Sequence, residues 1–229
     1  MRIHRFYGDV QPSQGSFTVT ENELIHQWKN VFRFRSGDRI VLFSGDGHEY
    51  LVEFLILEKK HASLTVVEKR SALMRTRNLT LYPALIKKDN LEWILQKCTE
   101  LGVSKFIPIL TERSEKKNFN RERAQKILVE ATEQSGWGAI PELGKLESLE
   151  DIVSKKENLI AFDGSGAAFN AQDFKTKINS LGVLIGPEGG FSQNELELFK
   201  KNSIPTYSLG KQTLRAETAA VAIASLLLL

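Results

Sequence analysis

A glycine-rich turn with acidic and polar neighbours is the clearest candidate for chemistry in this chain. The apolar run Leu181–Ile185 leads into Gly186-Pro187-Glu188-Gly189-Gly190, and Ser192 with Glu195 has the spacing of a capping box for a following helix. Ligands of open α/β sheets bind at the carboxyl ends of the strands. Glycines let the backbone approach a ligand without an intervening Cβ. The segment predicts a ligand-binding loop; the alternative is a tight turn that binds nothing.

The common nucleotide-binding motifs do not describe this loop. It lacks both G-x-x-x-x-G-K-[ST] and G-x-G-x-x-G. A partial match to the second pattern occurs at Asp163-Gly164-Ser165-Gly166, after the apolar run at 159–162. The third glycine and the downstream acid are missing, which favours an ordinary turn. A Rossmann-type cofactor loop at 163–166 remains the alternative.

A second candidate segment begins at Leu209-Gly210 and continues into an apolar helix expected over 215–229. Arg215 and Glu217 stand at the front of this helix. A cation there opposes the helix dipole, whereas Glu217 in the first turn is favourable. Arg215 therefore either contacts a ligand or is solvated or ion-paired. A helix that is apolar nearly all round is buried, and we expect it to pack against a partner subunit.

Basic residues cluster in two places. One run lies between Arg113 and Lys126, and a second set is interleaved with aromatic residues in the first part of the chain. Cations contact phosphates, and exposed aromatic rings stack on unpaired bases, so both sets suit RNA. The alternatives are a solvated charged face and an aromatic core. The basic residues that we assign to RNA binding are Arg2, Arg5, Arg33, Arg35, Arg113, Lys116 and Lys117.

The pattern of apolar residues predicts two kinds of structure along the chain. Up to about residue 70 it favours a small antiparallel β-domain, and beyond that strands alternate with helices, as in a mostly parallel sheet covered on both faces. In the first part we expect strands at 16–20, 40–43, 49–57 and 63–69 and a helix at 21–29. In the second we expect strands at 79–86, 105–111, 158–162, 182–185 and 204–209 and helices at 89–101, 121–134, 148–156, 194–201 and 215–229. Asp89 with Glu92 resembles a capping box, and Gly102 has the place of a C-terminal cap.

Composition excludes several classes of protein. The chain has 229 residues, a formal net charge of +3 and 41% hydrophobic residues, which is typical of a globular protein. The single cysteine, Cys98, excludes an internal disulfide and a cysteine-rich metal site, and it lies on the apolar face of its helix. No apolar stretch reaches the length of a membrane span, and the simplest location is the cytoplasm. All four histidines lie in the first third, so chemistry in the second half must use other groups, such as carboxylates.

Several motifs together resemble one enzyme family. These are Gly186–Ser192, Leu209-Gly210 and Leu214–Ala219, together with Lys97–Val103 and Glu133–Gly136, and Arg2–Phe6 and His26–Asp38 near the start. The combination resembles the RsmE family, the bacterial small-subunit (16S) ribosomal RNA uridine-N3 methyltransferases of the SPOUT superfamily. The resemblance extends over essentially the whole chain. Trp137 departs from it, because the family is expected to have an arginine after Glu-Gln-Ser-Gly.

The resemblance implies a fold and a cofactor. The fold is a PUA-like β-barrel domain for RNA binding, expected at residues 1–72, followed at 73–229 by an α/β SPOUT-type parallel sheet with a C-terminal trefoil knot. The cofactor is S-adenosylmethionine, and no metal is expected. The expected partners are 16S ribosomal RNA or the assembled small subunit, and a second copy in a homodimer. The residues expected to bind the cofactor are Leu184, Ile185, Gly186, Glu188, Gly189, Gly190, Leu209, Gly210 and Leu214.

The chemistry of methylation at uracil N3 suggests roles for the charged residues. The N3 proton must leave, and the negative charge that spreads onto O2 and O4 must be stabilised. We assign charge stabilisation to Arg215 and proton removal or substrate orientation to Glu217, with Glu188 as the second choice because it could instead hold the loop. An RNA-binding protein without catalytic activity is the alternative from another class, and affinity for S-adenosylmethionine separates the two.

Overall fold

The computed structural model describes residues 3–8, 15–114, 118–155, 158–175 and 180–229. They form two compact units. The first comprises Met1–Met74 with Thr132–Ile140, and the second comprises Arg75–Ala131 with Pro141–Leu229. The domain limits expected from the sequence, 1–72 and 73–229, remain a proposal. They assign residues 132–140 to the second domain, whereas in the structure these residues belong to the first unit.

The first unit is built on a five-stranded sheet of order β1-β3-β4-β5-β2. The predicted antiparallel meander is confirmed by β3, β4 and β5, while β1 pairs with β3 in parallel. Trp28 and Phe6 are fully buried, and Phe32 and Phe34 pack against the same core, so the aromatic residues interleaved with arginines belong mainly to this core. The elements are β1 (Arg5–Tyr7), β2 (Ser16–Val19), α1 (Asn22–His26), the π-helical turn η1 (Gln27–Val31), β3 (Arg39–Phe43), β4 (His48–Leu57) and β5 (Ala62–Ser71).

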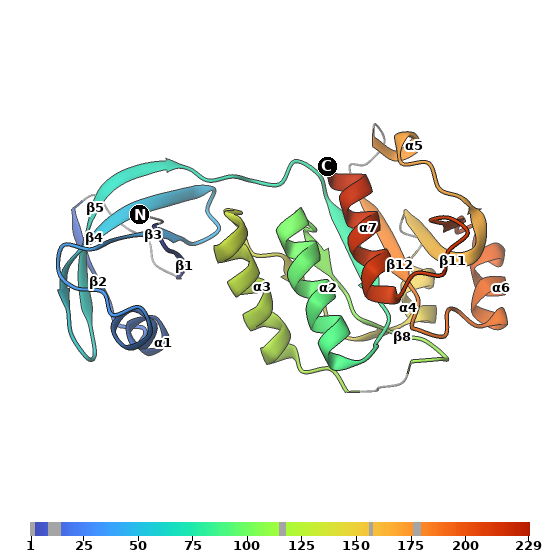
Figure 1. Ribbon diagram of the computed structural model, residues 1–229, viewed down its shortest axis with the longest axis horizontal. Helices are drawn as coiled ribbons and strands as arrows, with labels where there is room; N and C mark the ends of the chain where they lie inside the picture. Colours follow the sequence, from blue (N-terminus) through green and yellow to red (C-terminus); the bar gives the residue numbers. More distant parts are fainter. Residues whose placement is uncertain (1–2, 9–14, 115–117, 156–157, 176–179) are drawn as a thin grey trace. The chain divides into compact units, whose positions relative to one another are not determined.

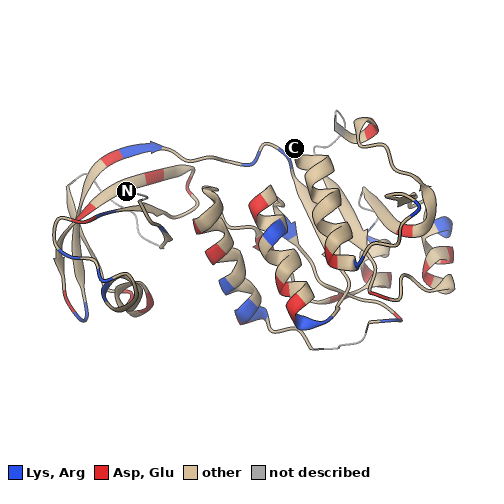
Figure 2. Ribbon diagram, viewed as in Figure 1, with Lys and Arg blue, Asp and Glu red and all other residues tan. Residues whose placement is uncertain are grey.

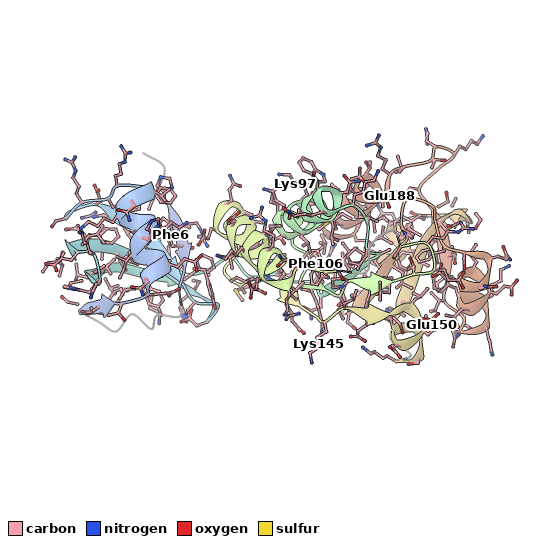
Figure 3. The ribbon with its side chains drawn as sticks, turned by 90° about the horizontal axis from the view of Figure 1, so that it is seen from below. Phe6, Lys97, Phe106, Lys145, Glu150 and Glu188 are labelled. Carbon is pink, nitrogen blue, oxygen red and sulfur yellow. The ribbon has the colours of Figure 1, made fainter. Side chains whose placement is uncertain are left out.

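The second unit contains a six-stranded sheet of order β13-β11-β12-β6-β7-β9, in which every neighbouring pair is parallel. Its central strands are almost wholly buried because helices cover both faces of the sheet (Figure 1). Phe106 of β7, labelled in Figure 3, is fully buried. The strands are β6 (Leu79–Pro83), β7 (Lys105–Phe106), β9 (Glu142–Leu143), β11 (Leu159–Ala168), β12 (Leu181–Ile185) and β13 (Thr206–Ser208); β8 (Ile109–Leu110) and β10 (Glu147–Ser148) form a separate parallel pair.

The helices of this unit follow the predicted alternation. They are α2 (Lys88–Leu101), α3 (Arg121–Ser135), whose last turn belongs to the first unit, α4 (Leu149–Ser154), α5 (Gln172–Lys175), α6 (Gln193–Lys201) and α7 (Ala216–Leu228). Helices α2 and α7 pack side by side (Figure 1). Figure 2 shows that α7 is almost uncharged along its length, while α2 and α3 carry both signs of charge. None of the helices in the described part of the chain is long and apolar enough to cross a membrane.

Three local predictions about this unit are wrong. The single strand expected at 105–111 is broken into β7 and β8, which belong to different sheets. Asp89 and Glu92 do not form a capping box: the N-cap of α2 is Lys87, and Glu92 instead pairs with Arg123 of α3 at 3.1 Å. The ordinary turn expected at 163–166 is also wrong, because β11 continues through these residues to Ala168 with an irregular register against β13. Gly166 permits this pairing, since a Cβ there would lie 2.5 Å from the backbone of Tyr207.

Candidate active site

A cavity of about 260 Å³ opens at the carboxyl edge of the sheet, where β12 and β13 end and where β11 leaves its regular pairing after Phe162. Its walls are Asp163 and Gly164 in β11, the loop Gly186–Gly190 after β12, and the segment that follows β13. These strands are adjacent in the order β12-β11-β13, so the three wall segments lie at one edge. This is the edge at which parallel α/β sheets bind ligands. The remaining lining residues are Phe162, Ile185, Tyr207, Ser208, Leu209, Gly210, Lys211, Gln212, Thr213, Leu214, Ala216 and Ala219.

Glycine is required at specific places in this wall. Gly190 has φ +69°, in the left-handed region, and a Cβ there would lie 3.3 Å from Asp163 Oδ2. Gly210 has φ +142°. A Cβ on Gly186 would lie 3.2 Å from the ring of Phe191, which is tight. Gly189 is different, because its Cβ would make an ordinary 3.4 Å contact with Arg113 Cδ. The strain that a side chain would bring therefore falls on Gly190 and Gly210.

Local and long-range hydrogen bonds hold the glycine loop. The predicted capping box is confirmed: the Ser192 amide donates to Glu195 Oε2 at 2.7 Å, and the Glu195 amide donates to Ser192 Oγ at 3.1 Å. Glu195 Oε1 also accepts from the Glu112 amide at 2.8 Å. Arg113 Nη1 donates to the carbonyls of Gly189 at 2.7 Å and Phe191 at 3.3 Å. Residues 112 and 113 thus clamp the loop from another part of the chain.

The clamp also affects a titratable group. Hydrogen bonds from the Ser192 and Asn194 side chains hold the pKa of the Glu112 carboxyl below its ordinary value. The Asn194 amide donates to Glu112 Oε1 at 3.2 Å. Glu112 therefore stays ionised at neutral pH next to the helix N-terminus that follows the loop.

Most of the residues expected to bind a cofactor line this cavity. Leu184 and Gly189 do not: Leu184 is fully buried in the core, and Gly189 contacts Arg113. The residues that do are Ile185, Gly186, Glu188, Gly190, Leu209, Gly210 and Leu214. Asp163 and Tyr207 also line the cavity. Tyr207 was not expected there, whereas Asp163 belongs to the segment 163–166, which the sequence offered as an alternative cofactor loop.

The two residues expected to be catalytic flank Ala216, which lines the cavity. The Arg215 side chain is 82% exposed, and its Nη1 lies 4.0 Å from Glu217 Oε1. The Glu217 side chain is only 13% exposed. Its Oε2 is buried and has no hydrogen-bond partner among the described residues. A buried acceptor in this state calls for a donor, and a ligand can supply one.

The residues expected to bind RNA have different surroundings. Arg33 and Arg35 are both exposed in the first unit. Arg5 pairs with Glu49, and its Nη2 donates to the Trp137 carbonyl at 3.2 Å. Trp137, which stands where the family is expected to have an arginine, therefore holds Arg5 through its backbone carbonyl. Arg113 is engaged in the clamp. Arg2, Lys116 and Lys117 lie outside the described residues.

The lining suits an organic cofactor. Backbone groups of the glycines, apolar side chains such as Leu209 and Leu214, and the carboxylates of Asp163 and Glu188 surround the cavity. Such a mixture fits a nucleoside that carries positive charge. Within the described residues, no group of three or more His, Cys, Asp or Glu side chains is arranged so that it could hold a metal ion. Burial raises the pKa of the Cys98 thiol far above its ordinary value, so this thiol is not a nucleophile.

Comparison with known proteins agrees with this architecture. An RNA methyltransferase domain model matches residues 74–228, and an RNA methyltransferase PUA domain model matches residues 29–67. The ribosomal RNA small subunit methyltransferase E of Rickettsia conorii is 32% identical over 100% of this chain and 97% of its own length. The protein of the same name from Bacillus subtilis is 33% identical over 89% of this chain and 86% of its own length.

Solved structures give the same result. The chain superimposes on a ribosomal RNA small subunit methyltransferase E from Neisseria gonorrhoeae bound to S-adenosyl methionine, with a TM-score of 0.87, 26% identity and coverage of 98% of this chain and 96% of that one. A chain from Legionella pneumophila in complex with the same cofactor gives a TM-score of 0.88 at 28% identity, over 99% and 97%. The predicted fold class, a PUA-like unit before a SPOUT-type α/β unit, is confirmed; the trefoil knot remains a prediction because strand order alone does not fix the threading.

The motifs of the sequence, the parallel sheet with its cavity and the full-length matches lead to one conclusion: the chain belongs to the ribosomal RNA small subunit methyltransferase E family.

Proposed function

We propose that this chain transfers a methyl group from S-adenosylmethionine to N3 of a uridine in 16S ribosomal RNA, in the cytoplasm. The observation that carries the proposal is the cavity between Asp163, the Gly186–Gly190 loop and the Ser208–Leu214 segment, in a chain with the family's motifs. Two solved relatives of this fold hold S-adenosylmethionine. The substrate is the RNA itself or the assembled small subunit.

Different walls of the cavity contact different parts of the cofactor. Ile185, Leu209 and Leu214 provide apolar surface for the adenine ring, and the glycines at 186, 190 and 210 provide backbone groups close to it. The carboxylates of Asp163 and Glu188 favour the positive charge of the amino and sulfonium groups. The Lys87 amide donates to Glu188 Oε1 at 3.5 Å, which supports the second role considered for Glu188, that of holding the loop.

Two charged residues at the start of α7 act on the substrate. The bound cofactor supplies an electrophilic methyl group, and N3 of uracil becomes a nucleophile only when its proton leaves. Glu217 Oε2, buried and without a donor among the described residues, accepts the N3–H hydrogen bond and then the proton. Arg215, which is largely exposed, folds over the bound base and stabilises the charge on O2 and O4.

The RNA contacts and the oligomeric state complete the proposal. Arg33 and Arg35 of the first unit contact phosphate, together with Arg2, Lys116 and Lys117. The functional form is a homodimer. Trp93 of α2 is 50% exposed, Leu226 of α7 is 45% exposed and Leu229, just after α7, is 76% exposed, and the two helices pack together. Large apolar side chains exposed on a packed pair of helices support a surface that a second copy covers.

Cofactor binding and methyl transfer are tested separately. Isothermal titration with S-adenosylmethionine measures the first, and transfer of a labelled methyl group to unmethylated small subunits or 16S RNA, followed by nucleoside analysis, measures the second. We expect Glu217→Gln to bind the cofactor as the wild type does and to lose about 10²-fold in kcat. Wild-type protein that binds RNA but not S-adenosylmethionine, with or without RNA present, would establish the binding-protein alternative instead.

The dimer has its own test. Leu226→Glu places a charge on the exposed face of α7, and we expect it to shift the molecular mass measured by light scattering from that of a dimer to that of a monomer. A wild-type protein that is monomeric at micromolar concentration would contradict the proposal.

A further inference from the structure

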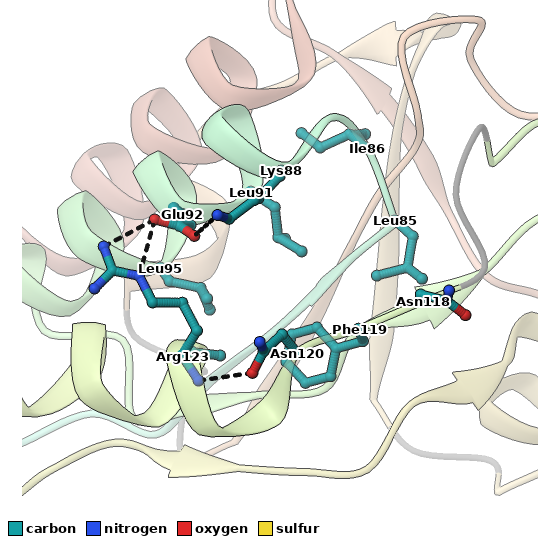
Figure 4. A pocket seen from close by; sticks show the side chains of 11 residues that line it. Leu85, Ile86, Lys88, Leu91, Glu92, Leu95, Asn118, Phe119, Asn120 and Arg123 are labelled. Carbon is teal, nitrogen blue, oxygen red and sulfur yellow. Dashed lines mark hydrogen bonds and ion pairs between the residues drawn. The ribbon is translucent and has the colours of Figure 1, made fainter.

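A second and larger cavity lies between α2 and α3, and the proposed function so far gives it no role. It measures about 430 Å³ and lies wholly within the second unit. Its floor is made of the buried side chains of Leu85, Ile86, Leu91, Leu95 and Ala124. Its rim carries Lys88, Glu92, Asn118, Phe119, Asn120 and Arg123. Figure 4 shows Phe119 entering from the α3 side and Leu91 from the α2 side.

We propose that this cavity binds an unpaired nucleobase of the RNA strand, apart from the base that is methylated. The inference rests on the proposed function in taking RNA as the substrate. A base has two flat apolar faces and polar edges, and proteins that bind unpaired RNA stack such faces on aromatic rings. Phe119 is half-buried at the rim and offers its ring above an aliphatic floor.

Polar groups at the rim match the edge of a base. Glu92 Oε1 is buried and has no hydrogen-bond partner in the described part of the chain, although Lys88 Nζ lies 3.7 Å away. It can accept from an N–H group, which every nucleobase carries on its Watson–Crick edge. The Asn120 Oδ1 atom accepts from the Arg123 amide at 2.9 Å, which leaves the Asn120 NH₂ group to donate to a base. The edges of the ligand therefore meet both an acceptor and a donor.

The charges at the rim favour a phosphate-bearing ligand. Lys88 and Arg123 share one carboxylate, that of Glu92, and Arg123 Nη2 lies 3.1 Å from its Oε2 (Figure 4). The two cations and one anion leave a net charge of +1 at the mouth. Both cations are exposed, so a backbone phosphate can reach them while its base enters the cavity.

The position of the cavity connects it to the active site. Lys87, between the lining residues Ile86 and Lys88, donates its amide to Glu188 at 3.5 Å, and Glu188 lines the candidate cofactor cavity. One hydrogen bond, from the Lys87 amide to Glu188, thus links the segment that lines the second cavity to a residue that lines the cofactor cavity. A base held between α2 and α3 fixes the RNA strand beside the loop that we assign to the cofactor.

Binding of short RNA tests the inference without any need for methylation. The probe is a fluorescein-labelled single-stranded RNA decamer of mixed sequence, compared by anisotropy with a decamer of the same backbone that has no bases. We expect wild-type protein to prefer the base-bearing decamer. Phe119→Ala and Phe119→Leu should each weaken its binding on the order of 10-fold, since stacking is worth about 1–3 kcal/mol per base, and should leave the abasic decamer unaffected. Phe119→Trp should keep the preference.

Control variants separate stacking from folding and from general charge. Melting temperature and S-adenosylmethionine affinity of each Phe119 variant check the fold and the neighbouring site. Lys145→Gln removes an exposed cation that does not line the cavity, and it should leave the preference for bases unchanged, whereas Arg123→Gln should weaken the binding of both decamers.

Several outcomes would overturn the nucleobase site. In the first, Phe119→Ala binds both decamers with wild-type affinity. In the second, it loses affinity for both decamers equally. In the third, it changes only the oligomeric state, which would show that a second copy covers the cavity. Because the assay requires no cofactor, a wild-type protein that fails to bind S-adenosylmethionine or to transfer methyl groups refutes the proposed function and leaves this test readable.

Discussion

The two adjacent glycines of the cofactor loop allow a matched test of the site. Gly190 has φ +69°, whereas a Cβ on Gly189 would only make a 3.4 Å contact with Arg113. An alanine in the left-handed region costs about 1–2 kcal/mol. The Cβ of Gly190→Ala would also lie 3.3 Å from Asp163 Oδ2, at the wall of the cavity. Gly190→Ala should therefore destabilise the loop by at least that amount, whereas Gly189→Ala should not.

The expected effect is large enough to measure in two ways. A loss of about 1–2 kcal/mol lowers Tm by roughly 2–8 °C in a protein of this size. If the loop moves to relieve the strain, cofactor binding must return the loop to its strained conformation. The affinity for S-adenosylmethionine then falls about 5- to 30-fold. Gly189→Ala should keep wild-type affinity and the same or a slightly higher Tm, because alanine restricts the unfolded chain. The assays are thermal unfolding by circular dichroism and isothermal titration with S-adenosylmethionine.

Two results would refute this reasoning. Equal loss of affinity in Gly189→Ala and Gly190→Ala would mean that side-chain bulk anywhere in the loop, rather than the backbone conformation of Gly190, decides binding. Wild-type affinity in Gly190→Ala, at an unchanged Tm, would mean that the loop does not hold the left-handed conformation in solution.

Three further predictions concern other features of the molecule. Ser192→Ala removes the cap of α6 and should cost about 0.5–2 kcal/mol in the free energy of unfolding, with weaker S-adenosylmethionine binding by titration; an unchanged Tm would contradict the role of the cap. Because burial raises its pKa, the Cys98 thiol should not react with Ellman's reagent at pH 8 in the native protein and should react fully in guanidinium chloride; reaction of the native protein would show that α2 opens. Glu49→Gln leaves Arg5 and Arg70 without their shared carboxylate and should lower the free energy of unfolding by about 1–3 kcal/mol. Glu53→Gln on the same strand removes only the more exposed ion pair with Arg39 and should lower it by less than about 1 kcal/mol. Equal shifts in Tm for the two variants would contradict the difference in burial.

Features encoded by neighbouring residues were predictable from the sequence. The capping box of α6 needs only Ser192 and Glu195, and Gly102 ends α2 in the left-handed conformation as expected. The same kind of pattern failed at Asp89 and Glu92, because the Glu92 carboxylate pairs with Arg123, 31 residues away. The chemical type of these residues is local information, whereas their choice of partner depends on how α2 and α3 pack.

The candidate site shows the same division. The glycine loop could be chosen from sequence because it follows the apolar strand β12, and the Leu209–Leu214 segment because Leu209-Gly210 and Leu214 belong to the motifs of the family. The clamp by Arg113 could not, because its partner Gly189 is 76 residues away and the contact exists only when both segments are in place. Arg113 belongs to a run of cations, and this run predicted RNA binding. Nothing in the sequence indicates that Arg113 binds the carbonyls of the glycine loop.

The order of strands in the parallel sheet has a consequence for how the chain is synthesised. Strand β6 pairs with β7, which follows soon after it, and with β12, whose residues Leu181–Ile185 are translated about a hundred residues later. Until then one edge of an apolar strand that contains Leu79 and Leu81 has no partner, and such edges invite pairing with other chains. The walls of the cofactor cavity extend to Ala219, so cofactor cannot stabilise this half-made sheet either. Pairing of β6 with strands of other chains is therefore a hazard of synthesis until β12 closes this edge.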